Sequence, residues 1–174
     1  RRRARRDRAV GRAVRLELED HGAARRALAT AAGSRLFILA VGAATAATIG
    51  LGDPAWTLIF PRRAAPFDGA LAWLFNPWAH WDGVWFIKIA VAGYAESDGS
   101  TAFFPLYPLL LRYVGVLFGG NLLLTGMAIS LASYGGAMVL LYRLVRAQYD
   151  ARTAALTVTL ISLVPTSLFF QAVY

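Results

Sequence analysis

One dense cluster of residues that could do chemistry, His80-Trp81-Asp82-Gly83, opens a segment with helical spacing. Trp85, Phe86 and Ile89 follow Asp82 at positions i+3, i+4 and i+7, which predicts a helix over 82–94 with Asp82 on its apolar face. A carboxylate there can cap the helix by accepting hydrogen bonds from backbone N–H groups. It can equally act as a general base, half-buried by aromatic rings at a membrane surface. The spacing does not choose between these two roles.

Other polar residues around this cluster leave alternatives open. Glu96 and Asp98 are typical of a solvated loop, and two loop carboxylates are weak support for the alternative, a divalent-metal site. Lys88 and Arg112 can hold their charged ends at a membrane interface or bind a phosphate. His80 taken alone is typical of an interfacial hydrogen-bonding residue. The sequence contains no P-loop, dinucleotide-binding, zinc or nucleophile-elbow motif.

The composition indicates the solvent around these residues. Hydrophobic types make up 57% of the 174 residues, charged types make up 16%, and there is no cysteine. The mean hydropathy is +0.50. These values exclude a disordered chain, a secreted disulfide scaffold and an ordinary water-soluble enzyme. They predict an all-α, polytopic integral membrane protein.

Charge-free stretches and arginine positions predict the topology. We expect about three spanning helices, over about 35–52, 121–142 and 153–172, with Arg35 reaching to the interface from the first. The positive-inside rule places two basic segments in the cytoplasm: the tail 1–33 and a short loop that carries Arg143, Arg146 and Arg152. The tail reads as solvated and partly helical. Adhesion to anionic headgroups is its alternative, and nucleic-acid binding is not expected because no aromatic residues interleave the basic ones.

Residues 53–120 then form a large outer loop, which holds all five tryptophans and therefore belongs at the interface. Short interfacial helices are predicted over Phe67–Phe75 and 82–94. A third, over Phe103–Gly119, is predicted to be interfacial or re-entrant, because two prolines break its first turns and Arg112 would be costly in a span. The chain begins without Met and ends within an apolar run, so we expect it to be part of a longer polypeptide.

Three blocks of this sequence resemble the GPI mannosyltransferase 2 (PIG-V) family over about 36–174. The blocks run from His80 through Trp81-Asp82-Gly83 to Tyr94, then Phe103-Phe104-Pro105-Leu106-Tyr107-Pro108, then Pro165-Thr166-Ser167-Leu168-Phe169-Phe170 with Tyr174. The resemblance implies a GT-C glycosyltransferase, of which residues 34–174 are the N-terminal part. It also implies an active site on the outer face of the membrane. Such enzymes move a sugar, here mannose, from a polyprenyl-phosphate carrier to an acceptor hydroxyl with inversion of the anomeric centre.

In this resemblance the family's first acidic residue of the outer loop falls on Asp82, which would be the catalytic base. Our own inference adds substrate-binding residues: His80, Lys88 and Arg112 to neutralise the leaving phosphate, and aromatic faces for the sugar or lipid from Trp81, Trp85, Tyr94, Phe104 and Tyr107. No cofactor or metal is expected to be required, because these cations can neutralise the leaving phosphomonoester.

The acceptor could be a glycolipid, a glycan or a protein. The membrane would be the plasma membrane of a bacterium or the endoplasmic reticulum of a eukaryote. A non-catalytic membrane protein, such as a transporter or a scaffold subunit, is the alternative from another class. The predicted spans argue against it because they contain no paired intramembrane charges.

Overall fold

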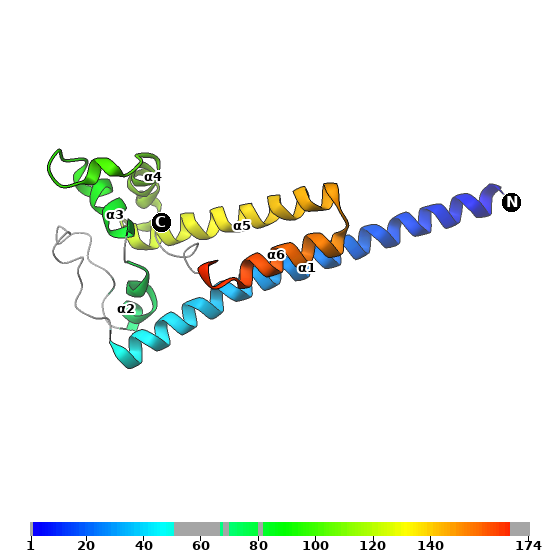
Figure 1. Ribbon diagram of the computed structural model, residues 1–174, viewed down its shortest axis with the longest axis horizontal. Coiled ribbons are helices and arrows are strands. Elements are labelled where there is room, and N and C mark those ends of the chain that lie inside the picture. The colour runs from blue at the N-terminus through cyan, green and yellow to red at the C-terminus, as the bar shows by residue number, and fades with distance from the viewer. Residues whose placement is uncertain (1, 51–66, 68–69, 80–81, 168–174) are drawn as a thin grey trace. The chain divides into compact units, whose positions relative to one another are not determined.

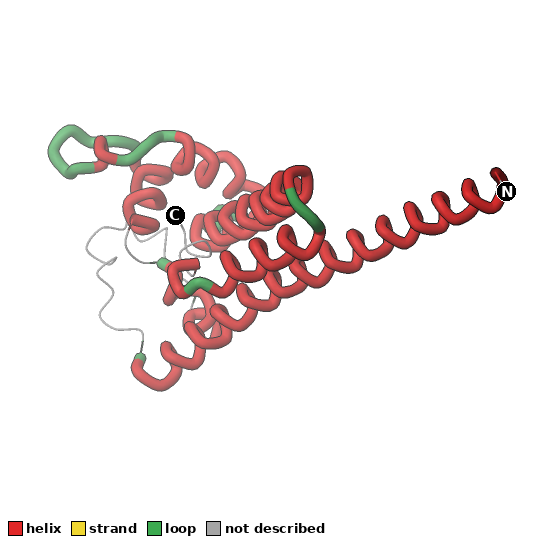
Figure 2. The backbone as a smooth tube through the Cα atoms, turned by 45° about the vertical axis from the view of Figure 1, so that its right-hand side comes forward, coloured by secondary structure: helices red, strands yellow, loops and turns green. Residues whose placement is uncertain are grey.

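The computed structural model describes residues 2–50, 67, 70–79 and 82–167, with the backbone alone for residues 2–19 and 70. Every regular element in these ranges is a helix (Figure 2), which confirms the predicted all-α class. Figure 1 labels the six α-helices: α1 (Arg2–Ile49), α2 (Ala70–Phe75), α3 (Asp82–Ala92), α4 (Leu106–Val114), α5 (Leu122–Gln148) and α6 (Ala151–Leu163). Short 3-10 turns lie at Asn76–Trp78, Ser100–Ala102 and Gly115–Phe118.

Two of these helices are long and apolar enough to cross a membrane: the part Asp20–Ile49 of α1, and α5. The prediction that Arg143, Arg146 and Arg152 lie in a loop is wrong. The first two residues lie on α5 and the third lies on α6. Arginine is a good helix former, and its long side chain can reach the interface without ending the helix.

The predicted third span, 153–172, begins within α6, which has 13 residues. The side chain of Asp150 caps this helix by accepting a hydrogen bond from the backbone N–H of Thr153 (2.7 Å). The helix ends at Leu163, because Pro165 disfavours helical backbone in the residue before it, and Val164 is extended. Residues 168–172 of the predicted span lie outside the described residues, and that span stays a prediction.

The chain divides into two compact units. Unit 1 consists of Arg1–Ser34 and Gly135–Pro165, and unit 2 of Arg35–Tyr134 and Thr166–Tyr174. Unit 1 buries small side chains, including Ala27, Ala31 and Ala154, which allow helices to approach closely as membrane helices do.

Unit 2 has a hydrophobic core built from several short helices. Trp78, Ile87, Leu111 and Met127 are among its buried members. Gly42 of α1 is required next to Trp78, because a Cβ atom at position 42 would lie 2.7 Å from the indole ring. The core therefore holds α3 and α4 against the beginning of α5, and this arrangement positions the residues predicted to do chemistry.

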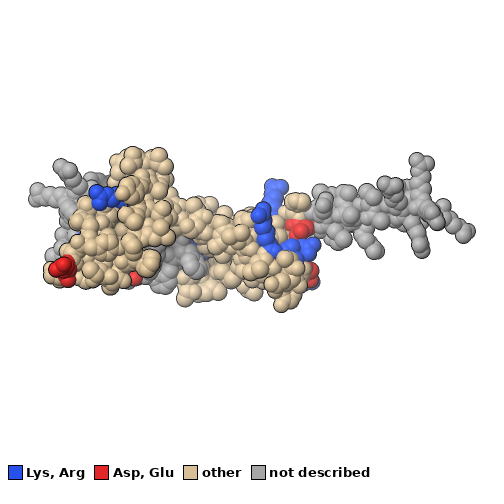
Figure 3. All heavy atoms as spheres, turned by 90° about the horizontal axis from the view of Figure 1, so that it is seen from above, with Lys and Arg blue, Asp and Glu red and all other residues tan. Residues whose placement is uncertain are grey.

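Helix α4 is short, as the prolines predicted. It begins directly after Pro105, and Pro108 lies in its first turn, where a missing N–H costs no hydrogen bond. The backbone then turns at Gly119 and Gly120, which both have positive φ angles (64° and 83°). Large apolar side chains on this helix and the turn after it are exposed: Leu106, Leu109, Leu110, Tyr113, Val116 and Leu117. On the face drawn in Figure 3, most of the described surface carries neither basic nor acidic side chains, as expected next to lipid.

Candidate active site around α3

Asp82 is the first residue of α3, and its side chain is exposed rather than half-buried. Within the described part of the chain, its carboxylate makes no hydrogen bond or ion pair, so it does not cap the helix there. Asp82 therefore presents an exposed carboxylate that no described residue engages. Its predicted neighbours His80 and Trp81 lie outside the described residues.

Core packing fixes this position. Helix α3 buries Gly83, Val84, Ile87, Ile89 and Ala90, and of these Ile87 and Ala90 belong to the core of unit 2. The predicted buried stripe of Trp85, Phe86 and Ile89 is therefore shifted, since Trp85 and Phe86 are only half-buried. The small residues Gly83 and Ala90, rather than the large rings, let α3 approach its neighbours.

The half-buried rings instead form an aromatic cluster between α3 and the segment before α4. Trp85 stacks on Phe103, with ring centroids 5.6 Å apart and planes 17° apart. Phe86 meets Phe103 and Tyr107 edge-on at 5.4 and 5.1 Å. Some of the aromatic rings that were predicted to contact a sugar, those of Trp85 and Tyr107, are thus partly covered by contacts within the protein.

Lys88 forms an ion pair with Asp98 in which Nζ lies 2.6 Å from Oδ2, and its ammonium lies 4.7 Å from the centroid of Trp85. The hydrogen bond from Lys88, followed by those from Ser100, lowers the pKa of Asp98 well below its usual range. The charge of Lys88 is therefore already compensated. This contact argues against the predicted role of Lys88 as a free ligand of phosphate.

The loop after α3 is held by a compact hydrogen-bond network. Gly93 ends the helix with a positive φ of 81°. The hydroxyl of the fully buried Ser100 accepts a hydrogen bond from Ala95 N (2.9 Å) and donates one to Ala95 O (3.2 Å). The described residues contain no group of three His, Asp or Glu that could hold a metal ion. Glu96 is exposed and Asp98 pairs with Lys88, so the structure gives the alternative metal site no support.

The remaining predicted substrate-binding residues divide into two groups. Tyr94 donates a hydrogen bond to Phe103 O (3.0 Å), and Tyr107 donates one to Gly126 O (3.0 Å), so both hydroxyls have structural roles. Phe104 is 81% exposed. Arg112 is exposed in the last turn of α4 and makes no ion pair within the described ranges. Phe104 and Arg112 are therefore available to a ligand, whereas Tyr107 is largely a link between α4 and α5.

Sequence reasoning missed a buried arginine. Arg35, expected to reach to the interface, is 4% exposed. Its guanidinium donates hydrogen bonds to the carbonyl and the hydroxyl of Ser167 (2.6 Å to Oγ) and lies 4.5 Å from the centroid of the Tyr134 ring. An arginine next to an apolar run was the available signal, since such residues usually have a buried partner.

Comparison with known proteins identifies the family. The sequence profile described as Mannosyltransferase (PIG-V) matches residues 55–174, which include all of α2 to α6. The chain belongs to the PIG-V mannosyltransferase family. This confirms the resemblance seen in the sequence, and it makes the two apolar helices those of a membrane protein.

One curated relative of this PIG-V family chain is "GPI mannosyltransferase 2" from Drosophila pseudoobscura pseudoobscura. It is 28% identical over 127 residues, which cover 66% of this chain and 28% of the relative. The chain thus spans less than a third of the length of that relative. No solved structure matches the chain. Asp82, Lys88, Asp98 and Arg112 all fall within the region that the family profile matches.

Proposed function

We propose that this chain carries the acceptor-activating part of a membrane mannosyltransferase. The enzyme would move a mannosyl unit from a polyprenyl-phosphate donor to an acceptor hydroxyl on the outer face of the membrane, with inversion. The match of the PIG-V family over residues 55–174 supports the mannosyl transfer. The observation that carries the assignment of the site is the exposed carboxylate of Asp82, which no described residue engages, at the start of a helix fixed by the core.

In this proposal Asp82 is the general base. Its carboxylate accepts the proton of the acceptor hydroxyl while the acceptor oxygen forms a bond to the anomeric carbon. The bond from that carbon to the phosphate oxygen breaks on the opposite face, which inverts the anomeric centre. The departing group is a polyprenyl phosphate that stays in the bilayer. Asp82 then releases its proton to water, and the site is ready for another donor.

The departing phosphate needs positive charge nearby. Of the two described cations predicted for this role, Arg112 fits better, because Lys88 is bound by Asp98 whereas Arg112 has no acidic partner within the described ranges. The planar guanidinium of arginine also matches two phosphate oxygens at once. His80 stays a candidate from the sequence. With cations in this role, the proposal requires no metal.

The test uses the full-length protein with a polyprenyl-phosphate mannose labelled in the sugar. We expect label in an organic-extractable or glycan product, with an anomeric configuration opposite to that of the donor when probed with anomer-specific mannosidases. EDTA should leave the rate unchanged. Transfer only from a nucleotide sugar, or retention of configuration, would contradict the proposal, and full inhibition by EDTA would contradict the metal-free mechanism alone.

A further inference from the structure

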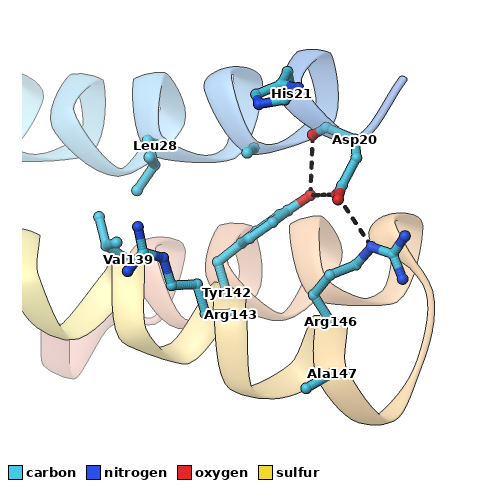
Figure 4. Close-up of a pocket in the computed structure, with 9 residues that line it drawn as sticks. Asp20, His21, Leu28, Val139, Tyr142, Arg143, Arg146 and Ala147 are labelled. Carbon is cyan, nitrogen blue, oxygen red and sulfur yellow. Dashed lines mark hydrogen bonds and ion pairs between the residues drawn. The ribbon is translucent and has the colours of Figure 1, made fainter. Parts of the chain in front are cut away.

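Unit 1 contains a cavity of about 460 Å³ between α1 and α5 (Figure 4). Its charged lining residues include Asp20, Arg143 and Arg146, and its apolar ones include Leu28 and Val139. None of these residues belongs to the proposed active site. The cavity thus joins a polar end to an apolar end within two adjacent helices.

A fixed polar network forms the charged end. The hydroxyl of Tyr142, which is 7% exposed, donates a hydrogen bond to Asp20 Oδ1 (2.6 Å). Nε of Arg146 lies 3.2 Å from the same oxygen, an ion pair without the alignment of a hydrogen bond, so this buried N–H has no acceptor among the described residues. The negative charge of Asp20 is compensated within this network (Figure 4).

Arg143, the other arginine of the lining, is available to bind a ligand. Arg143 is exposed and makes no ion pair in the part of the chain that the structure describes. Its guanidinium is turned toward α1, beside Val139 (Figure 4). Two arginines stand against one carboxylate in the lining, so the cavity has a net positive charge. A single phosphate diester would neutralise that charge with the bidentate geometry that guanidinium groups favour.

The apolar end of the cavity indicates that the ligand also has an apolar part. Val139 lies one helical turn before Arg143, and the neighbouring Leu140 and Leu144 of α5 are exposed as on a lipid-facing surface. Helix α5 has 27 residues. At 1.5 Å per residue it is roughly 40 Å long, close to the thickness of a bilayer with its headgroups. Arg143 and Arg146 in its last turns therefore lie near headgroup level, and Val139 lies nearer the hydrocarbon.

We propose that this cavity binds an anionic phospholipid. Its phosphodiester lies beside the guanidinium of Arg143, and the first part of an acyl chain lies along Leu28 and Val139. Basic pockets between membrane helices are suited to such headgroups, and the surface charge of an anionic leaflet supplies the ligand at high local concentration. A soluble phosphate would occupy the charged end and leave the apolar end in water, which is why the structure favours the lipid.

The experiment measures lipid binding to the full-length protein in detergent, by native mass spectrometry with dioleoyl phosphatidylglycerol and, separately, the zwitterionic dioleoyl phosphatidylcholine. We expect a preference for phosphatidylglycerol that Arg143→Gln weakens about fivefold, the effect of roughly one surface arginine. Val139→Phe fills the apolar end without changing any charge, and it should weaken binding as well. The matched control is Arg25→Gln, which removes an equal charge from an exposed position of α1 that lines neither this cavity nor the one beside α6.

Three results would overturn the proposal. An equal loss in Arg25→Gln would mean that the preference reflects net charge and not this cavity. A loss in Arg152→Gln with normal binding in Arg143→Gln would assign the lipid to the neighbouring cavity between α1 and α6, which Arg26 and Arg152 line. Complete competition by millimolar inorganic phosphate, together with normal binding in Val139→Phe, would show a phosphate site with no lipid component.

Discussion

The carboxylates near the two ends of α3 have opposite environments. At its start, Asp82 is exposed and has no polar partner within the described residues. Past its end, Asp98 is held by Lys88 and by the backbone N–H of Ser100 (2.9 Å), and Ser100 in turn binds Ala95. Both regions carry carboxylates on short segments near the same core, yet one carboxylate stabilises the loop and the other has no partner among the described residues.

The cations of unit 2 show the same contrast. Lys88 is engaged by Asp98 and Trp85, whereas Arg112 has no acidic partner in the described ranges. A group whose hydrogen bonds are already made in the resting protein gains little by binding substrate, because each new contact must replace an existing one. This difference supports the proposed chemical roles of Asp82 and Arg112, and it gives Lys88 and Asp98 a role in loop structure. Four predictions test that division.

The largest expected effect is that of Asp82→Asn. The amide cannot accept the acceptor proton, so turnover by the full-length enzyme should fall by about 10²–10⁴-fold. Thermal stability should change little, because the carboxylate has no described partner. Glu96→Gln is the matched control, since Glu96 is also an exposed carboxylate without a described partner, and its turnover should be normal. Near-normal turnover in Asp82→Asn at matched folded concentration would remove Asp82 from the mechanism and make Glu96 the next candidate.

Arg112→Gln should give the next largest effect. Loss of a charge-assisted contact to the donor phosphate is expected to raise the donor KM or lower kcat/KM by about tenfold to a hundredfold. Lys88→Gln should leave donor KM nearly unchanged per folded molecule and lower the melting temperature instead, because Lys88 holds the loop. Steady-state kinetics with the polyprenyl-phosphate donor separate the two variants. The opposite pattern, a KM effect confined to Lys88→Gln, would exchange the roles of the two cations.

Much of this division could be predicted from the sequence, because it depends on local patterns. The prolines predicted a short interfacial helix over Phe103–Gly119, of which α4 (Leu106–Val114) forms the central part, and the family motif made Asp82 a candidate. Those features are set by backbone constraints within a few residues of each other.

The parts that the sequence did not reveal depend on partners distant in the chain. Arg35 binds Ser167, which follows 132 residues later, so the apolar run next to Arg35 could signal a buried partner but could not identify it. The pairing of Lys88 with Asp98 requires the turn at Gly93, and the buried face of α3 was misassigned because Gly83 and Ala90 pack closely while larger rings stay at the margin. The tertiary core overrides hydrophobic periodicity there.

Ser100→Ala is expected to destabilise the loop without affecting chemistry. Removing the buried hydroxyl leaves the N–H and the carbonyl of Ala95 without their partner, at a cost of about 1–3 kcal/mol in unfolding free energy. Turnover per folded molecule should stay close to that of the wild type. Thr101→Ala is the control, because the adjacent Thr101 is exposed. A lower turnover in Ser100→Ala without a lower melting temperature would contradict this structural role, since the loop would then take part in catalysis.

The smallest effect is expected in the pH dependence of stability. The pKa of Asp98 is lowered in the folded protein by the hydrogen bond from Lys88, so its ionised form favours folding above the ordinary carboxyl pKa of 3.8. That contribution is lost as the pH falls below this value, toward the lowered pKa of the folded state. In Asp98→Asn the contribution is absent at every pH.

Melting temperatures between about pH 3 and pH 7 therefore measure the contribution of the Asp98 carboxylate to stability. The wild type should be more stable than Asp98→Asn by a constant margin in the upper part of this range, and the margin should shrink toward the acid end. If the margin for Asp98→Asn instead stays constant down to the lowest pH, the ion pair with Lys88 contributes nothing to folding, and Lys88 returns as a candidate ligand of the donor phosphate.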